Sequence, residues 1–488
     1  MDSRKYGVIL CQSNIEQKVS KRTMNLIQIA WRNFCHRSLS SILTTLSLAL
    51  GVGLVVLVLS IYGVINEAFT RNASVGYNLV VGPKGSPLQL TLNSVFYLSQ
   101  PIENLPYTEY MEFLSEAERS EMVDRFGGDE ELKQRGGRYA PFIGDGFVIP
   151  LALGDYFGEF RVVGTTPLFF EKLRHGPTLE QTFTFSSGRA FQDFSEEHSY
   201  FEAVVGSRVA KEMNVGVGDQ FFPTHGDPTG HGHDLGFTIV GVMDPTGTPN
   251  DRAAFVNLEG FYLMDGHAKP IEETTADDSE KTPQGKLSPD LEPKVAKRDD
   301  YRLLSIPERE VTSLLVRTGN IMFAPSMQNA INEGIRSQAA APVGEINKLM
   351  GLIVGPLKNA MLMITLITCV VAAVGILVSI YNSMNDRKRD IAVMRALGAR
   401  RSTVTTIIIY ESLLVATIGA IVGWILAHAG ITAYSGTIED QTGVQVGFFT
   451  TSGNEVWILP LVILFALIAA LLPAWSAYRT DVGSNLSA

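Results

Sequence analysis

The sequence predicts a membrane protein with four transmembrane α-helices in a one-plus-three arrangement, and a large α+β extracytoplasmic domain between helices 1 and 2. The first observation is a set of four apolar runs, at about 42–65, 361–381, 404–427 and 456–472. Each run is long enough, or nearly so, to cross the ~30 Å hydrocarbon core of a bilayer as a helix. The second observation is a soluble stretch of roughly 290 residues between the first two runs. The third is an uneven distribution of basic residues among the loops.

Basic residues gather in alternate loops. Seven lie before the first run, and the loop between the second and third runs carries Arg387, Lys388, Arg389, Arg395, Arg400 and Arg401. The loop after the third run has no Lys or Arg. Because cytoplasmic loops carry the excess of basic residues, both termini and the 383–402 loop are expected in the cytoplasm, and the large domain and the 429–455 loop outside it.

The predicted order along the chain is a polar extension (1–23), a cytoplasmic amphipathic helix (24–41), membrane helix one (42–65), the extracytoplasmic domain (66–358), membrane helix two (359–382), a cytoplasmic loop helix (383–402), membrane helix three (403–428), an outer loop (429–455), membrane helix four (456–475) and a cytoplasmic tail (476–488).

The first segments leave two alternatives open. Residues 1–23 are polar and unpatterned, so translation from Met1 and from Met24 are both open. In 24–41, apolar residues alternate with a basic polar face, which favours a helix lying on the cytoplasmic leaflet. The alternative is a plain extension of the first membrane helix. That helix is expected to be retained, because no small-residue cleavage site follows it.

The extracytoplasmic domain reads as α+β. A short helix is predicted at Ser207–Met213 and a stalk of helical pattern at about 327–358, interrupted near Pro342 and Pro356. Residues 268–300 are rich in charged residues, Thr and Pro, which is typical of a disordered insertion. Strands are predicted where short apolar runs end in Gly or Pro, at Asn78–Val81, Phe160–Gly164, Ala203–Gly206, Phe237–Val242, Ala253–Val256 and Val311–Val316.

Several function classes are disfavoured. The glycine-rich Gly82–Pro87 segment lacks the residue order of a phosphate-binding loop, and no complete loop of that kind occurs, so ATP hydrolysis by this chain is not expected. No nucleophile elbow or H-E-x-x-H motif indicates an enzyme. The net charge of −10 without a basic stripe argues against a nucleic-acid partner. Cys11, Cys35 and Cys369 all lie outside 66–358, so no disulfide is expected in the large domain.

The cytoplasmic loop contains a short amphipathic helix. Its apolar face is formed by Ile391, Met394 and Leu397, and Gly398 stops it. Such a surface suits docking of another protein. The alternative is a basic anchor on anionic lipid.

This loop and three other segments resemble the MacB/FtsX-type permeases of ABC transporters. The loop reads RKRDIAVMRALGA from Arg387, and the chain ends with LLPAWSAYRTDV. The segments VVGSRVAKEMNVGVGDQ and FTIVGVMDPTGTPNDRAAFV of the large domain are similar to the MacB-type periplasmic domain. The third run is also similar to the family. The insertion at 268–300 is not part of the family pattern.

The resemblance implies a permease in the bacterial inner membrane that works with a separate ABC ATPase, as a homodimer or with a paralogous permease. It implies that no cofactor is bound directly and that ATP acts through the partner subunit. It further implies that 383–399 docks on the ATPase, and that ATP-driven movement is transmitted to the extracytoplasmic domain. The coupling residues would be Arg387, Arg389, Ile391, Met394, Arg395, Leu397 and Gly398.

Three positions in the third run are candidates for specific roles. Glu411 is an acid within a membrane helix. It is interpreted as a structural anchor that pairs with Arg32 or Arg37, with proton or substrate handling as the alternative. Gly419 and Gly423 have the spacing that permits close packing of membrane helices. The alternative is that they are ordinary glycines of a membrane helix.

A histidine cluster in the large domain is a candidate zinc site. His225, His231, His233 and Asp234 fall within ten residues. Imidazoles and a carboxylate suit Zn²⁺ or Cu²⁺. The alternative is a solvated hairpin loop, because the intervening Gly-Asp-Pro-Thr-Gly segment is typical of turns.

Two classes of function follow. The first is a permease subunit that drives export or release of a lipoprotein, peptide or small molecule. The second is a transmembrane signalling scaffold that transports nothing and regulates a partner outside the cytoplasm. A third possibility is a form of either function that responds to a metal ion. A periplasmic adaptor, lipoprotein or hydrolase would be the partner.

Overall fold

The computed structural model describes residues 25–36, 38–72, 75–176, 178–226, 232–264, 266–267, 301–386, 398–437 and 447–448, and a few positions between 460 and 475. These residues divide into two compact units. The helical unit contains the chain up to Gly63 together with Pro356–Ser435, and the large domain is built on Val64–Gly355. The predicted insertion at 268–300 and the extension at 1–23 lie outside the described residues.

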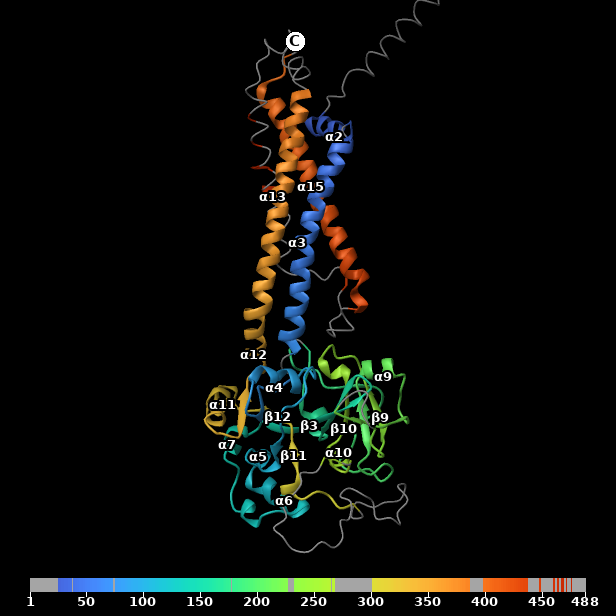
Figure 1. The fold of residues 1–488 in the computed structure, drawn as a ribbon, viewed down its shortest axis with the longest axis vertical. Coiled ribbons are helices and arrows are strands. Elements are labelled where there is room, and N and C mark those ends of the chain that lie inside the picture. Colours follow the sequence, from blue (N-terminus) through green and yellow to red (C-terminus); the bar gives the residue numbers. More distant parts are fainter. Residues whose placement is uncertain are drawn as a thin grey trace, which may run out of the picture. The chain divides into compact units, whose positions relative to one another are not determined.

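The helical unit contains all or most of the helices α2 (Leu26–His36), α3 (Ser38–Asn72), α13 (Gly355–Asp386) and α15 (Arg401–Ala433) (Figure 1). Within the described chain, three stretches are long and apolar enough to cross a membrane: Ser41–Asn66, Pro342–Thr368 and Arg401–Ala433. The first and third agree with the predicted membrane helices. The second begins earlier than predicted, although α13 covers all of 359–382. Most of 456–475, the predicted fourth helix, lies outside the described residues.

The N-terminal helix α2 is an element distinct from α3, and Ala30 on it is fully buried while Ile27 and Trp31 are exposed. The expected helix at 24–41 therefore forms over Leu26–His36. The helix α3 packs against α15 through Leu48, Val52 and Val56.

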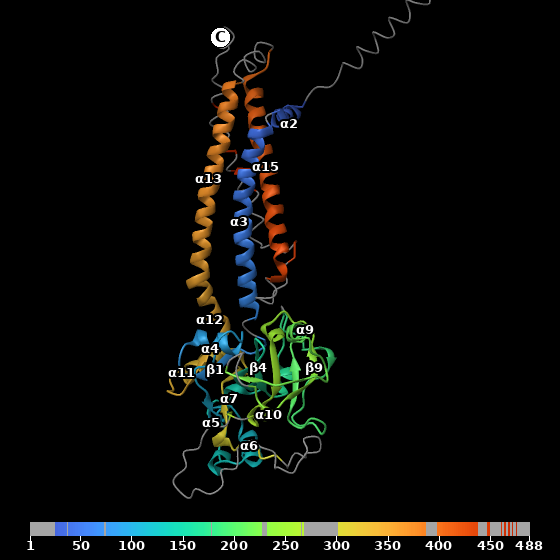
Figure 2. The same cartoon turned by 45° about the vertical axis from the view of Figure 1, so that its right-hand side comes forward.

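A mixed sheet forms the centre of the large domain. Its strands pair in the order β13-β1-β12-β3-β4-β10-β6-β9-β5, with β7 on β9 and β8 on β3. In Figure 2, β1, β4 and β9 follow one another across the domain in this order. A separate ladder joins β2 and β11. The strands are β1 (Leu79–Pro83), β2 (Leu105–Pro106), β3 (Phe147–Phe157), β4 (Phe160–Thr165), β5 (Phe185–Gly188), β6 (Glu202–Val205), β7 (Gln220–Phe221), β8 (Thr224–His225), β9 (Phe237–Met243), β10 (Ala253–Asn257), β11 (Glu310–Val311), β12 (Ser313–Arg317) and β13 (Ser337–Ala340).

Short helices cover both faces of this sheet. They are α4 (Pro87–Ser94), α5 (Tyr107–Met111), α6 (Glu116–Phe126), α7 (Ala140–Ile143), α8 (Leu168–Lys172), α9 (Ser207–Met213), α10 (Leu258–Tyr262), α11 (Ala324–Asn332) and α12 (Pro342–Leu349), with 3₁₀ turns η1 (Glu130–Lys133), η2 (Pro249–Arg252), η4 (Ile306–Glu308) and η5 (Ile321–Phe323) and a π-helical turn η6 (Met350–Val354).

The strands bury side chains on both faces because helices lie on each side. In β10, Phe255 joins one core cluster, which α4 and α8 cover, and Val256 joins another, which α9 and α10 cover. A third cluster under α5, α6 and α11 receives Val81 and Leu314. Successive residues of a strand point to opposite faces of the sheet. Because helices cover both faces here, the residues on both faces are apolar.

The predicted strands at 78–81, 160–164, 203–206, 237–242 and 253–256 and the helix at 207–213 are confirmed. The run at 311–316 is divided between β11 and β12. The stalk prediction is wrong in one part. Ser337–Ala340 is not helical but forms β13, which pairs with β1 at the edge of the sheet. Pairing with an available edge strand here outweighs the helix propensity of Gln and Ala. From Pro342, the α12 helix, the π turn and α13 follow without interruption.

Candidate functional site

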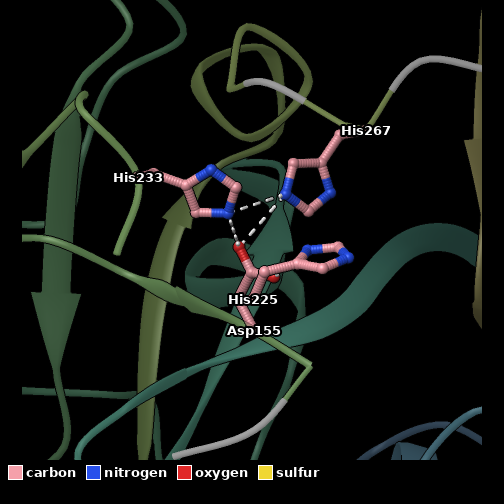
Figure 3. Close-up of side chains that lie close together, drawn as sticks. All are labelled: Asp155, His225, His233 and His267. Carbon is pink, nitrogen blue, oxygen red and sulfur yellow. Dashed lines mark hydrogen bonds and ion pairs between the residues drawn. The ribbon is translucent and has the colours of Figure 1, made fainter. Parts of the chain in front are cut away.

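Four side chains of the large domain bring potential metal-ligand atoms together. Asp155, His225, His233 and His267 each offer one nitrogen or oxygen, and these atoms all lie within 4.8 Å of one another. We call these residues the His/Asp group. Figure 3 shows the rings of His233 and His267 directing nitrogens toward each other and toward the Asp155 carboxylate.

Asp155 and His225 are placed by strand pairing. Asp155 lies near the end of β3, and His225 on β8 is its direct antiparallel partner. The pairing of β3 with β4 shifts its register between Leu153 and Tyr156. Irregularities of this kind re-aim individual side chains, and Asp155 is fully buried. The sheet therefore holds a carboxylate in the protein interior beside an exposed imidazole.

His233 and His267 come from two other segments. The backbone N–H of His233 donates to the carbonyl of Pro223 at 2.9 Å, so the chain returns alongside β8. His267 lies shortly after α10, and its ring packs on Phe261 of that helix at 4.3 Å between centroids. Side-chain exposure is 8 % for His233 and 7 % for His267, against 59 % for His225. Two of the imidazoles are thus buried with Asp155, and the third borders solvent.

The distances within the group are short. The Nε2 atoms of His233 and His267 each lie 3.1 Å from Asp155 Oδ2, and 3.3 Å from each other. His225 Nδ1 lies 3.2 Å from the other carboxylate oxygen, Oδ1. Oδ2 is buried and accepts no hydrogen bond of acceptable geometry despite its two close nitrogens. A buried, unsatisfied carboxylate oxygen is costly, so this arrangement requires an explanation.

The ionisation of Asp155 is set by its neighbours. Burial opposes ionisation, but interactions with His233 and His267 outweigh it and hold the pKa of Asp155 well below its usual range. Because the angles at Oδ2 do not suit hydrogen bonds, we attribute this effect to the proximity of the imidazoles rather than to directed hydrogen bonds. The carboxylate is therefore an anion at neutral pH.

A cavity of about 620 Å³ opens beside the group and is lined by His225 and His267. Arg161, Glu103 and Glu310 also line it. The Arg161 guanidinium stacks on Tyr156 at 4.2 Å and donates to the carbonyl of Ser99 at 2.8 Å. The cavity gives small solutes a polar route to the His/Asp group.

The structure brings together only part of the predicted zinc site. His225 and His233 belong to the group, His231 lies outside the described residues, and Asp234 is exposed and is not part of the group. Asp234 lies in a bend immediately after His233, and its side chain is exposed. Sequence reasoning missed Asp155 and His267. Neither residue lies in a motif, and the strand that carries Asp155 was not predicted, so the sequence gives no signal that places them in this group.

The predicted coupling residues fall almost entirely outside the described residues: Arg387, Arg389, Ile391, Met394, Arg395 and Leu397. Gly398 is described and has φ of 100°. This left-handed conformation is typical of a residue that ends a helix, and it favours glycine.

The predicted packing glycines lie where α15 approaches α3. A Cβ at Gly423 would clash with the backbone carbonyl of Ala49, and one at Gly419 would lie 2.9 Å from Leu48 Cδ2. On α3, a Cβ at Gly53 would lie 3.1 Å from the carbonyl oxygen of Gly423. The two backbones approach closely because these positions carry no side chain. Glu411 is half-buried on the same helix, whereas Arg37 lies outside the described residues, so the pairing of Glu411 with Arg32 or Arg37 stays a prediction.

Two family models match separate parts of the chain. The MacB-like periplasmic core domain matches residues 41–280, and the FtsX-like permease C-terminal domain matches residues 362–482. The first includes the whole His/Asp group, and the second includes α15 and the 383–402 loop.

Curated relatives agree with these matches. The macrolide export ATP-binding/permease protein MacB of Bordetella avium is 30 % identical over 126 residues, which cover 26 % of this chain and 18 % of that protein. The lipoprotein-releasing system transmembrane protein LolC of Haemophilus influenzae is 26 % identical over 132 residues, 26 % of this chain and 33 % of LolC. MacB of Neisseria meningitidis serogroup A is 23 % identical over 235 residues, 45 % of this chain and 32 % of that protein. The chain spans a third or less of each of these relatives.

An FtsX-like permease C-terminal domain joined to a MacB-like periplasmic core domain defines the class of this protein. The chain belongs to the MacB/FtsX-type permeases of ABC transporters.

Proposed function

We propose that this chain is the permease subunit that couples ATP hydrolysis by a separate ABC ATPase to movement of its large domain, and so drives export or release of a substrate across or from the bacterial inner membrane. The observation that carries the proposal is the pair of family matches on one chain, at 41–280 and 362–482. A lipoprotein, peptide or small molecule is the proposed class of substrate. The active form is proposed to be a homodimer or a pair of paralogous permeases.

Packing inside the large domain supports transmission of movement. Ile65 and Phe69, near the end of α3, pack with Ile346 of α12 and with Met350. Residues of α4 and its C-terminal flank join the same cluster, and Leu90 of α4 belongs to the main core of the sheet. Packed interiors shift as units rather than deform continuously. A displacement of either helix would therefore be passed through α4 to the sheet.

The proposal is tested by isolating the full-length protein from its own host in detergent, with and without ATP, and identifying its partners by mass spectrometry. An ABC ATPase is expected to co-purify, together with an extracytoplasmic protein that names the substrate class. Recovery of a cell-wall hydrolase with the ATPase would favour the signalling scaffold instead. Recovery of no ATPase from folded protein would contradict the coupling function.

The double variant Met394→Asp/Leu397→Asp is expected to abolish stimulation of the co-purified ATPase by the permease. Both positions lie on the apolar face predicted for the docking helix, and a charge there would be buried against the partner at a cost of several kcal/mol. The measurement is ATP turnover by the ATPase with each permease variant in lipid nanodiscs.

The matched control is Ser484→Asp/Asn485→Asp, which adds the same charge to the predicted cytoplasmic tail, outside the 383–399 segment. Its ATPase stimulation is expected to stay close to that of the unmodified protein. Equal stimulation by Met394→Asp/Leu397→Asp and by the control would show that the docking surface lies elsewhere.

A further inference from the structure

We propose that Asp155, His225, His233 and His267 form a Zn²⁺ site in the large domain, with three imidazole nitrogens and one carboxylate oxygen as ligands. The site joins β3, the β8 hairpin and the segment after α10. It does not depend on the proposed transport function, because it rests on side chains within one domain.

The distances match a metal site more closely than a set of hydrogen bonds. With Zn–N and Zn–O bonds of about 2.0–2.1 Å, neighbouring ligand atoms of a tetrahedral site lie about 3.3 Å apart. The three pairs formed by Asp155 Oδ2, His233 Nε2 and His267 Nε2 measure 3.1, 3.1 and 3.3 Å. These atoms form a triangle with the dimensions of one face of such a tetrahedron. The ligand nitrogen of His225 lies within 4.8 Å of all three and supplies the fourth corner.

Hydrogen bonding within the group does not satisfy its atoms. The two Nε2 atoms can form one hydrogen bond with each other, in which one ring donates and the other accepts. Asp155 Oδ2 remains without a hydrogen bond although it is buried. A cation centred among these atoms would satisfy Oδ2 and both nitrogen lone pairs at once. Ligand type supports zinc, because imidazole with one carboxylate in tetrahedral geometry suits Zn²⁺, whereas Cu²⁺ favours tetragonal sites.

Access and surroundings also fit. The cavity beside the group is lined by His225 and His267, so an ion reaches the ligands from solvent. Phe261 packs on the His267 ring and fixes its plane. A bound ion would cross-link segments that are distant in sequence, because Asp155 and His225 are 70 residues apart and His233 and His267 are 34 apart. Binding to the folded state alone would stabilise the large domain.

The test uses the full-length protein in detergent, purified with an affinity tag free of histidine and treated with a chelator. Zn²⁺ is then added in a competition titration with a zinc-sensitive dye. We expect one tightly bound ion per chain and a melting temperature that rises by several degrees with Zn²⁺. Substitution with Co²⁺ is expected to give the visible absorption that tetrahedral cobalt shows.

His233→Ala and His267→Ala are expected to weaken zinc binding about 100-fold or more, since loss of even an outer-shell partner costs 10–100-fold. Asp155→Asn preserves the shape of the buried side chain and is expected to remove the tight site as well. His198→Ala is the control, because His198 contacts Glu197 and lies outside the group. Far-UV circular dichroism of the metal-free proteins verifies that each variant is folded.

The proposal is overturned if the folded unmodified protein takes up no zinc in this titration, or if His198→Ala weakens binding as much as His233→Ala does. It is also overturned if zinc binds but Co²⁺ gives only the weak spectrum of octahedral coordination. Transport or ATPase activity is not a readout, so failure of the proposed function would leave these results unaffected.

Discussion

Replacing Arg309 with methionine is expected to destabilise the large domain by about 3–5 kcal/mol, because it leaves the carboxylate of Glu259 buried without its partner. The guanidinium donates to both Glu259 oxygens, at 2.9 and 2.6 Å, and side-chain exposure is 0 % for Arg309 and 9 % for Glu259. For a domain of this size, a loss of this order lowers the melting temperature by roughly 10 °C. The measurement is thermal unfolding of the full-length protein in detergent.

The position of Arg309 explains the size of the effect. Its guanidinium lies over the ring of Phe126 at 3.5 Å, and Tyr107 and Tyr262 flank it at 5.4 and 5.2 Å. It therefore connects α5, α6 and α10. Its Nε also donates to the carbonyl of Leu304 at 2.8 Å. Methionine fills much of the volume, so the loss reflects the isolated charge and the lost hydrogen bonds rather than a large cavity.

A double variant distinguishes charge from packing. Adding Glu259→Leu to Arg309→Met removes the isolated carboxylate and is expected to restore most of the lost stability. Lys133→Met is the control, because Lys133 pairs with the exposed carboxylates of Asp124 and Glu130, and solvent-exposed ion pairs contribute little to stability. An Arg309→Met protein that melts within 2 °C of the Lys133→Met control would contradict the assigned role.

The strands that the sequence predicted are those whose pattern is local. β4, β9 and β10 are short apolar runs with a Gly or Pro nearby, and each forms where expected. The longest strand of the described chain, β3, was not predicted, because Pro150 and Gly154 interrupt its pattern. Proline is disfavoured within a central strand, yet Pro150 pairs opposite Leu314 of β12. Pairing on both sides of β3 outweighs the local signal.

Two of the four residues of the His/Asp group were predicted, because only local patterns can be recognised in a sequence. His225 and His233 are close in sequence, so their proximity is visible without a structure. Asp155 becomes their neighbour only through the register of β3 and β8, and His267 only through the position of α10. Such contacts depend on which strands pair and in which register, and neither can be inferred from the spacing of residues along the chain.

The role of α10 connects the group with the buried ion pair. Glu259 of this helix binds Arg309, and Phe261 of the same helix packs on the ring of His267. Loss of the ion pair is therefore expected to weaken the placement of His267 as well as the stability of the domain. Neither the ion pair nor the ring contact could be predicted from the sequence. Sequence-based prediction relies on the periodic spacing of apolar residues, and single long-range contacts leave no such spacing.

Gly423→Leu is expected to separate α3 from α15 and to destabilise the helical unit by about 3 kcal/mol or more. Even the Cβ atom would clash with the carbonyl oxygen of Ala49, and it would lie 3.0 Å from both the Gly53 nitrogen and Val52 Cβ. Two of these three atoms are backbone atoms, so a change of side-chain rotamer cannot make room. Membrane helices associate mainly by close packing, because lipid gives no hydrophobic gain.

Gly430→Leu provides a matched control on the same helix, because a Cβ at Gly430 meets no atom within 4 Å. It introduces the same side chain and slightly favours helix formation, so its melting temperature is expected to equal or exceed that of the unmodified protein. Hydrogen exchange measured by mass spectrometry should show faster exchange in α3 and α15 for Gly423→Leu alone. If both variants melt and exchange alike, the contact of Gly423 with α3 does not hold these helices together, and the close approach at Gly53 would be incidental.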